Sequence, residues 1–376
     1  MNNIKIKAFI LAVLIMVGYG GYQYFRPYNP SPQTLTSAQQ ETMNKITAEI
    51  KPYCVGRYIL DLPSSFVAYN DSAPLEQNRW AAVISRPEDM YKTYLATKRM
   101  YPPGFKQLIA LREKTLQNSK TIDVQDMPFL KKVWLLPDGM DGMIFERNEN
   151  GGVSDAMRIL EGYLYTNGVV IKLQKQTVND SAPRYETQRL GDPIQNYVQA
   201  DVNQMQSLMA RISGRENDDI PTTPGSCINH AFIASDLTEK DEEDIKIRFI
   251  SNIFDNIRVV VSNNNFTPEE NTLLDRMGEI KSNISRSRGR VERNGAFIVN
   301  GLQAQEFLAA GLQEDNDEPR YQFEMYINEM TASYQSPGFM LILNNQRMPP
   351  TSYSKEEIIA FWDTLSRSVR VRPGAF

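Results

Sequence analysis

The sequence contains two stretches in which the same kinds of segment follow one another in the same order, and this repetition limits the folds open to the chain. Each stretch opens with a cysteine at the head of an apolar run, at 54–63 and at 227–233. Strand-like segments come next, and an amphipathic helical pattern closes each stretch, at 192–212 and at 354–369. This order predicts two related α+β domains. A chance similarity between the two halves is the alternative.

Tight-turn signals separate the strand-like segments in both halves. Asn-Gly at 167–168 and 300–301, and Asp-Gly at 141–142, favour two-residue hairpin turns because both positions accept a positive φ. Capping-box patterns at 85–88 and 267–270 predict a helix start in each half. Runs of strands joined by hairpins favour antiparallel sheets.

Changes in composition divide the chain further. The stretch 213–226 is polar and holds Pro221 and Pro224, which is typical of a domain boundary. The residues after the N-terminal apolar run are also polar and contain Pro27, Pro30 and Pro32, which favours a stiff tether that need not fold. We therefore expect a membrane segment at 1–30, a polar tether at 31–50, an N-terminal α+β domain at 51–215, a linker at 216–226 and a C-terminal α+β domain at 227–376.

The N-terminus has the pattern of an export signal. Lys5 and Lys7 precede a largely apolar stretch at 8–25, which is just long enough to span a bilayer as a helix. No convincing small-x-small cleavage site follows it, so an uncleaved, single-pass transmembrane anchor is expected, with the body outside the cytoplasm. A cleaved signal that releases a soluble protein is one alternative, and a buried core helix is another.

Charge and residue counts exclude several classes of function. Lys and Arg number 41 against 45 Asp and Glu, so the net charge is -4 and general nucleic-acid binding is not expected. One histidine and two cysteines offer no spacing for a metal site, and no cofactor fingerprint is present. Outside the cytoplasm, Cys54 and Cys227 are candidates for a disulfide. Two buried free thiols are the alternative.

Catalytic patterns are weak. His230 is the single histidine that a nucleophile–histidine–acid triad could use, and Ser154, two residues after Gly152, is the nearest approach to a nucleophile elbow. A hydrogen-bonded structural histidine is the simpler interpretation. We expect no catalytic residue and no small-molecule substrate, with a hydrolase that uses Ser154 or a pair of carboxylates as the alternative.

Two acidic stretches are candidates for contact with a partner protein, because charge complementarity commonly sets the specificity of an interface. Solvated surface is the simpler interpretation of both. The candidate residues are Asp241, Glu242, Glu243 and Asp244 in the first stretch, and Glu314, Asp315 and Asp317 in the second.

One motif carries a family resemblance. The residues Cys54-x-Gly56-Arg57-Tyr58-x-x-Asp61-Leu62-Pro63 follow the N-terminal anchor, and Gly225-Ser-Cys227 and Asn300-Gly301-Leu-Gln-Ala-Gln-Glu306 occur in the second half. Over residues 50 to 370 or so, this pattern resembles the immunity proteins that protect bacteria against type VI secretion lipase effectors.

The resemblance implies a binding protein without catalytic residues. It would bind and inhibit a phospholipase effector in the periplasm, protecting the producing cell and its kin, while anchored in the bacterial inner membrane. Anchoring would raise the local concentration of the inhibitor at the lipid that the toxin attacks. A structural or adaptor subunit of an envelope or secretion complex is the alternative, ahead of an envelope hydrolase.

Overall fold

A computed structural model describes residues 28–30, 32–69, 75–236, 240–313 and 317–376 of the chain. The expected membrane segment at 8–25 lies outside the described residues, and so do Glu314 and Asp315. Among the described residues, no helix is both long and apolar enough to cross a membrane.

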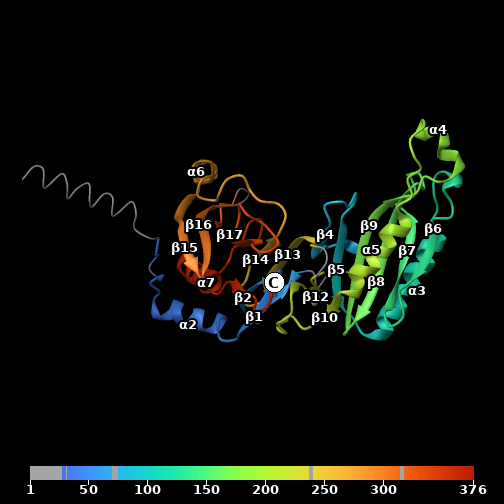
Figure 1. The fold of residues 1–376 in the computed structure, drawn as a ribbon. Helices are drawn as coiled ribbons and strands as arrows, with labels where there is room; N and C mark the ends of the chain where they lie inside the picture. The colour runs from blue at the N-terminus through green and yellow to red at the C-terminus, as the bar shows by residue number, and fades with distance from the viewer. Residues whose placement is uncertain (1–27, 31, 70–74, 237–239, 314–316) are drawn as a thin grey trace, which may run out of the picture.

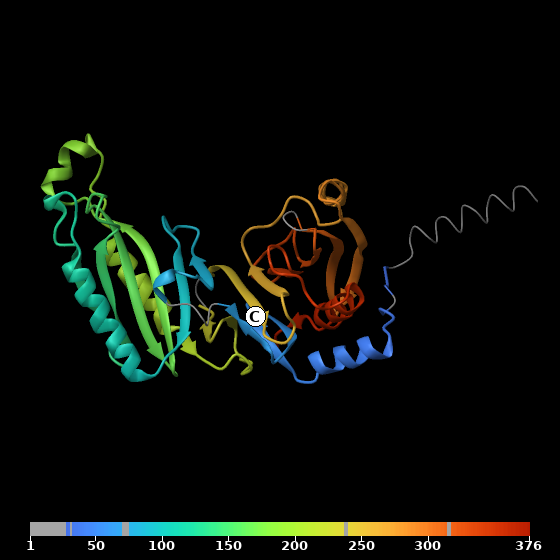
Figure 2. The ribbon, with the colours of Figure 1, turned by 180° about the vertical axis from the view of Figure 1, so that it is seen from behind.

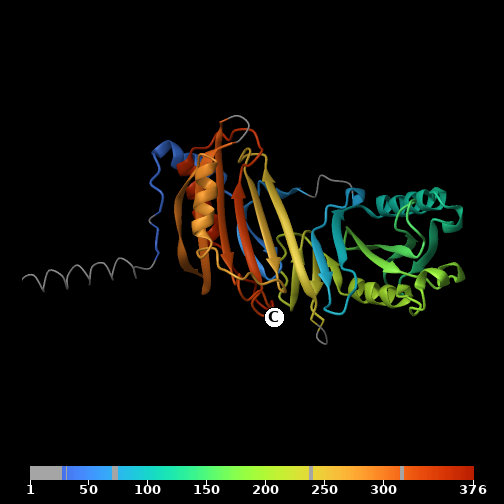
Figure 3. The ribbon, with the colours of Figure 1, turned by 90° about the horizontal axis from the view of Figure 1, so that it is seen from above.

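The fold is α+β, with two domains built on antiparallel strands, as the hairpin signals predict. Thirteen of the described strands join in one continuous sheet that runs through both domains (Figures 1 and 3). From one edge to the other its order is β15 (Arg290–Val299), β16 (Leu302–Leu312), β17 (Pro319–Ile327), β18 (Gly338–Asn344), β14 (Arg258–Asn264), β13 (Glu242–Ser251), β4 (Ala82–Ser85), β5 (Thr93–Arg99), β9 (Val169–Val178), β8 (Met157–Thr166), β7 (Asp141–Asn148) and β6 (Leu130–Leu135), with β3 (Phe66–Ala68) also paired to β13.

Two smaller sheets and a set of helices complete the fold. The first small sheet has the order β1 (Ile50–Val55), β2 (Tyr58–Pro63), β19 (Arg370–Val371), and the second has the order β10 (Ile212–Gly214), β12 (Ala231–Ala234), β11 (Gly225–Ile228). The described α-helices are α2 (Ser37–Ile46), α3 (Pro102–Asn118), α4 (Glu186–Arg189), α5 (Val198–Ala210), α6 (Met277–Arg286) and α7 (Lys355–Arg367), with short 3₁₀ turns at Leu75–Gln77, Val124–Asp126 and Pro183–Tyr185.

Helices α3 and α5 cover opposite faces of the sheet in the first domain. Neighbouring residues of a strand point to opposite faces, and β8 shows this at positions 162 and 163. Tyr163 belongs to the same hydrophobic cluster as Phe105 of α3, and Phe105 stacks on Tyr165, two residues further along the same face of β8. A Cβ at Gly162 would lie 2.4 Å from the Met209 side chain of α5, so the helix approaches the bare backbone there. Figure 2 shows α3 along the outer side of this domain.

In the second domain, one face of the sheet packs on α7 and on the small sheet that contains β1 and β2. Helix α7 begins with a complete capping box between Ser354 and Glu357, as the sequence predicts. Its buried Ile358, Trp362 and Leu365 belong to the main hydrophobic core. Burial of this apolar face, rather than helix propensity, is what holds α7 in place.

The N-terminal part of the described chain lies against the second domain. Strand β2 pairs with β19 near the C-terminus, and α2 lies beside α7 (Figure 2). In the expected tether at 31–50, the structure therefore has a helix. A capping box between Thr36 and Gln39 starts α2, and Met43 and Ile46 are buried in the main core. Sequence reasoning missed this helix because the stretch is mostly polar, although Met43 and Ile46 have helical spacing.

Local signals were partly right. The Asn-Gly pairs at 167–168 and 300–301 form the turns of hairpins, with Asn167 and Asn300 at positive φ. The helix predicted from 85–88 is wrong, because Ser85 ends β4 and the chain turns back into β5. Helix α6 begins later than the capping pattern at 267–270 predicts. The Asp-Gly pair at 141–142 lies within β7, and the turn is formed by the residues before it.

Candidate partner-binding surface

The two cysteines meet where the halves join. Cys54 in β1 and Cys227 in β11 form a disulfide, and both are fully buried. Beside the disulfide, Gly56 and Cys227 exchange two backbone hydrogen bonds of 2.8 Å. The strands that open the two halves are therefore joined both covalently and through the backbone.

A buried ion pair lies close to the disulfide. Arg57 directly precedes β2. Its guanidinium lies 3.3 Å from the carboxylate of Glu243, at the start of β13. Arg57 also donates a 2.6 Å hydrogen bond to the Ala375 carbonyl, and it stacks 4.2 Å from the centre of the Tyr334 ring. Burial raises the pKa of Glu243 above its ordinary value, against the opposing influence of Arg57.

Burial removes two of the predicted contact residues from the surface. Asp241 is 8% exposed and forms ion pairs with Arg86 and Arg211, at 3.4 and 2.7 Å. Glu243 is 4% exposed and binds Arg57. The acidic run was expected on solvated surface or in a docking loop. It enters β13 instead, where β13 pairs with β4, and buried carboxylates need cationic partners.

The other predicted contact residues keep some exposed surface or lie outside the described residues. Glu242 is half-buried and accepts a 3.1 Å hydrogen bond from Ser85. Asp244 is half-buried, and burial raises its pKa despite the nearby Lys246 and Lys92. Asp317 is exposed and forms an ion pair with Arg288. Partner binding at Glu242, Asp244 and Asp317 stays a prediction.

Asp244 lines a groove of about 340 Å³ that both halves of the chain help to form. The first half contributes Lys92, from the connection between β4 and β5, whose ammonium lies 4.8 Å from the centre of the Phe266 ring. We call this the Lys92 groove. Its lining residues are Lys92, Asp244, Ser262, Asn264, Phe266, Thr267, Glu269, Tyr326, Ile327, Glu329, Ala332, Gly338, Phe339 and Met340.

The sheet next to the Lys92 groove exposes one face. In β13, Ile245, Ile247 and Phe249 are buried, whereas Lys246 and Arg248 between them are exposed. Figure 3 shows α6 over the strands nearest β15, while β13 and β14 carry no helix on that side. A groove with charges of both signs beside an uncovered sheet face suits a protein partner better than a small molecule.

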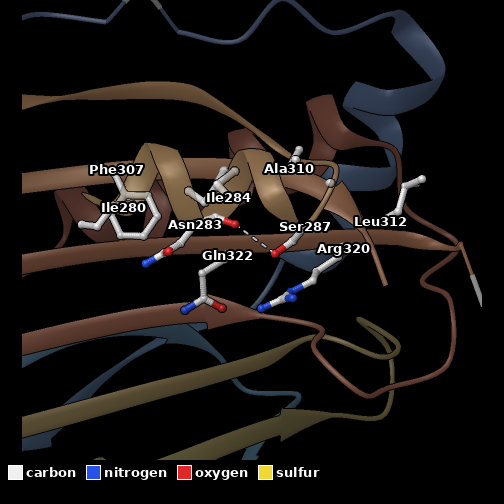
Figure 4. Close-up of a pocket in the computed structure, with 12 residues that line it drawn as sticks. Ile280, Asn283, Ile284, Ser287, Phe307, Ala310, Leu312, Arg320 and Gln322 are labelled. Atoms are coloured by element: carbon white, nitrogen blue, oxygen red, sulfur yellow. Dashed lines mark hydrogen bonds between the residues drawn. The ribbon is translucent and has the colours of Figure 1, made fainter. Parts of the chain in front are cut away.

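A second pocket, of about 220 Å³, lies between α6 and the sheet (Figure 4). Ile280 and Ile284 of α6 face Phe307 of β16 there, and Arg320 and Gln322 lie on the opposite side. These apolar contacts attach α6 to the sheet.

The structure does not bring the weak catalytic candidates together. Ser154 donates a 2.8 Å hydrogen bond to Tyr185, which directly precedes α4. His230 directly precedes β12, is 6% exposed, and accepts a 3.3 Å hydrogen bond at Nδ1 from Arg99. Figure 1 shows α4 and β12 in separate parts of the fold. Among the described residues, no group of three or more His, Cys, Asp or Glu side chains could hold a metal ion.

Sequence reasoning missed the partners that matter most at the junction. Arg57 was noticed within a motif, but its pairing with Glu243 was not, since the two are far apart in sequence. Lys92 carried no sequence signal, because its place in the groove depends on how β4 and β13 pair.

Both halves match models of one protein family. Residues 51–215 match the Tle cognate immunity protein 4 N-terminal domain, and residues 219–374 match the Tle cognate immunity protein 4 C-terminal domain. The chain therefore belongs to the Tle cognate immunity protein 4 family. No curated protein matches it in sequence.

Solved structures share its fold. A chain described as part of the Tle4-Tli4 complex aligns with a TM-score of 0.64 and 19% identity, over 87% of this chain and 98% of that one. The apo immunity protein TplEi of the type VI secretion system (T6SS) of Pseudomonas aeruginosa aligns with a TM-score of 0.63 and 19% identity, over 86% and 97%. The same organism's TplEi in complex with an "L" peptide gives 0.59 and 18%, over 86% and 98%.

Proposed function

We propose that this chain is an immunity protein that binds and inhibits a lipase-class effector of the type VI secretion system, without catalysing a reaction itself. The observation that carries the proposal is the match of both halves to the two domains of one immunity-protein family. A chain of the solved Tle4-Tli4 complex shares this fold.

The arrangement of the domains supports an inhibitor that works by steric fit. Strand β13 pairs with β4, and the disulfide and the Arg57–Glu243 pair lie beside that contact. The two domains are thus held as one frame, so the Lys92 groove is preorganised. A preorganised surface loses little conformational entropy when a partner binds.

We also propose that the protein acts in the periplasm, held in the inner membrane by residues 8–25. The support is the sequence pattern of Lys5 and Lys7 followed by an apolar stretch of bilayer-spanning length. A toxin that attacks membrane lipid is met most effectively at the membrane, where anchoring raises the concentration of the inhibitor.

Growth rescue and direct binding test the proposal together. The lipase-class effector encoded beside this chain, directed to the periplasm, should stop growth, and co-expression of the full chain should restore it. The purified chain should bind that effector, abolish its phospholipase activity and show no hydrolysis of its own. If no neighbouring effector is neutralised, or if the purified chain hydrolyses phospholipid, the proposal is wrong.

Charge reversal tests the surface. Lys92→Glu should weaken effector binding by about tenfold or more, as expected for a lost charge complement across an interface. Lys114→Glu, an exposed position on α3 away from the Lys92 groove, is the matched control and should leave binding unchanged. If Lys92→Glu binds the effector as tightly as Lys114→Glu and the unsubstituted chain do, the interface lies elsewhere on the molecule.

A further inference from the structure

Tyr28, at the start of the described chain, occupies a socket on the edge of the second domain. Its hydroxyl donates a 2.7 Å hydrogen bond to Glu306 of β16. Its ring lies against Gly295 of β15, where an added Cβ would come within 2.3 Å of the ring atoms. The Phe297 ring lies 6.3 Å away, centre to centre. A side chain at 295 would exclude Tyr28, so the contact depends on a glycine at that position.

The hydrogen-bond acceptor in the socket is well fixed. Glu306 is fully buried, and it also accepts hydrogen bonds from Trp362 at 2.9 Å and from both terminal nitrogens of Arg367 at 2.6 and 2.9 Å. Burial acts to raise the pKa of Glu306, but Arg367 and Arg293 outweigh it and lower the pKa, so the carboxylate stays charged. Burial and this carboxylate both raise the pKa of Tyr28, whose hydroxyl therefore remains a donor.

The chain after Tyr28 is fastened as well. Leu35 packs on the main core, and Met43 and Ile46 of α2 are buried in it. Gln39 donates a 3.0 Å hydrogen bond to Ser354 at the start of α7. The second domain thus holds this stretch at both ends.

The position of Tyr28 in the sequence limits how far its socket can lie from the membrane. Only Arg26 and Pro27 separate Tyr28 from the expected membrane segment at 8–25. Three residue steps span at most about 11 Å, so a docked Tyr28 cannot lie far from the bilayer surface. Strand β15 is the edge of the sheet, and its Ile298 is 68% exposed. Figure 1 shows β15 and α4 at opposite ends of the molecule.

We propose that Tyr28 is a latch that holds the β15 edge of the second domain against the lipid headgroups, so that the first domain projects away from the membrane. The inference rests on the membrane anchor in the proposed function. The docked Tyr28 gives the two domains a fixed orientation on the membrane, where a free tether would not. The Lys92 groove then lies at a constant distance from the bilayer surface when an effector arrives. The binding partner of the β15 edge is therefore the lipid bilayer in which residues 8–25 are anchored.

Energy transfer to the membrane tests the latch. The full chain is reconstituted in vesicles of phosphatidylethanolamine and phosphatidylglycerol that carry an acceptor dye on some headgroups. A donor dye is attached at Ile298→Cys in β15 or at Leu190→Cys beside α4, since both described cysteines are already paired. Transfer should be several-fold stronger from position 298 than from position 190.

Variants of the socket should remove this difference. Tyr28→Ala and Gly295→Val act from the two sides of the contact, and each should bring the two transfer signals close together. Tyr28→Phe keeps the ring and should retain part of the difference, whereas Asn29→Ala, at an exposed neighbour, should retain all of it. Thermal unfolding of each variant checks that the second domain is folded.

The outcomes separate the latch from the proposed function. Equal transfer from positions 298 and 190 when Tyr28 and Gly295 are intact, an unchanged difference on Tyr28→Ala, or failure of the chain to enter vesicles would each overturn the latch. Effector binding in detergent is measured on the same variants and should be unaffected by Tyr28→Ala. If no effector binds while the transfer signals still respond to Tyr28→Ala, the latch stands and the proposed function fails.

Discussion

The guanidinium of Arg57 lies 3.3 Å from the carboxylate of Glu243, and both side chains are buried where the two halves of the chain meet. Arg57 directly precedes β2, and Glu243 lies at the start of β13, the strand that pairs with β4 and β3. This one contact therefore links the small sheet, the main sheet and the domain junction.

Removing one partner of this pair should be costly. Arg57→Met leaves the buried Glu243 without its cation and should lower the free energy of unfolding by about 3–5 kcal/mol. The double variant with Glu243→Gln should lose less than the sum of the single variants, because the two groups interact directly. Chemical denaturation followed by tryptophan fluorescence measures both.

The control for this prediction is a more exposed pair in the same region. Arg370 lies 2.9 Å from Asp61, with about a third of each side chain exposed. Arg370→Met should cost about 0–1 kcal/mol. If Arg57→Met and Arg370→Met lower the free energy of unfolding equally, burial does not determine how much the Arg57–Glu243 pair contributes to stability.

Gly56 should tolerate no side chain. It has a φ of +57°, and an added Cβ would lie 1.8 Å from Oδ1 of Asn263. Gly168 also has a positive φ, of +77°, but a Cβ there would meet nothing within 4 Å. Backbone strain alone costs roughly 1–2 kcal/mol, so Gly168→Ala should lose about that much and Gly56→Ala clearly more. Thermal melts of the two variants compare them directly, and similar melting temperatures would contradict the steric argument.

Stability should fall in acid because of Glu161. Burial acts to raise the pKa of Glu161, but Arg112 and Arg147 outweigh it and lower the pKa from 4.5 to about 2. A depressed carboxyl pKa stabilises the fold fully above pH 4.5, and this stabilisation disappears as the pH falls toward 2. The difference corresponds to about 3 kcal/mol. Urea denaturation at pH 7, 5 and 3 should show it.

The comparison with Glu161→Gln isolates this residue from the other carboxylates. The variant should be less stable than the parent at pH 7, and the gap should narrow as the pH approaches 3. A gap of constant size would mean that Glu161 titrates at the same pH in the folded and unfolded chains.

Opening the disulfide should destabilise the chain without altering its fold. Cys54 and Cys227 are separated by 173 residues, and closing so large a loop restricts the unfolded chain strongly. The Cys54→Ser/Cys227→Ser variant should lose about 2–5 kcal/mol of unfolding free energy. Denaturation of the parent with and without reductant should reproduce the loss, while reductant should leave the double variant unchanged. An effect of reductant on the double variant would contradict this origin.

Several elements could be predicted from sequence because their signals act over three or four residues. The hairpin turns at Asn167 and Asn300 need only a positive φ at adjacent positions, and the Ser354–Glu357 capping box starts α7 through contacts within one turn. The pairs of strands on either side of those turns follow directly. The antiparallel α+β class rests on signals of this kind, whereas the family resemblance rests on the longer motif at 54–63 and on two segments of the second half.

The remaining features depend on segments that meet only after the chain has folded. Composition predicted a tether where α2 packs on α7, because burial of Met43 and Ile46 requires a core supplied by distant residues. The acidic run at 241–244 suggested surface, but Asp241 and Glu243 are buried once Arg86, Arg211 and Arg57 converge on them.

By itself, the sequence determined the hairpin turns at Asn167 and Asn300, the start of α7, the antiparallel class and the two-part order of the chain. Only the tertiary structure decided that β13 pairs with β4 to make one sheet of both domains, and that Tyr28 reaches Glu306. The physical reason is that edge pairing and side-chain burial depend on the joint geometry of surfaces far apart along the chain, for which no short pattern of residues is sufficient.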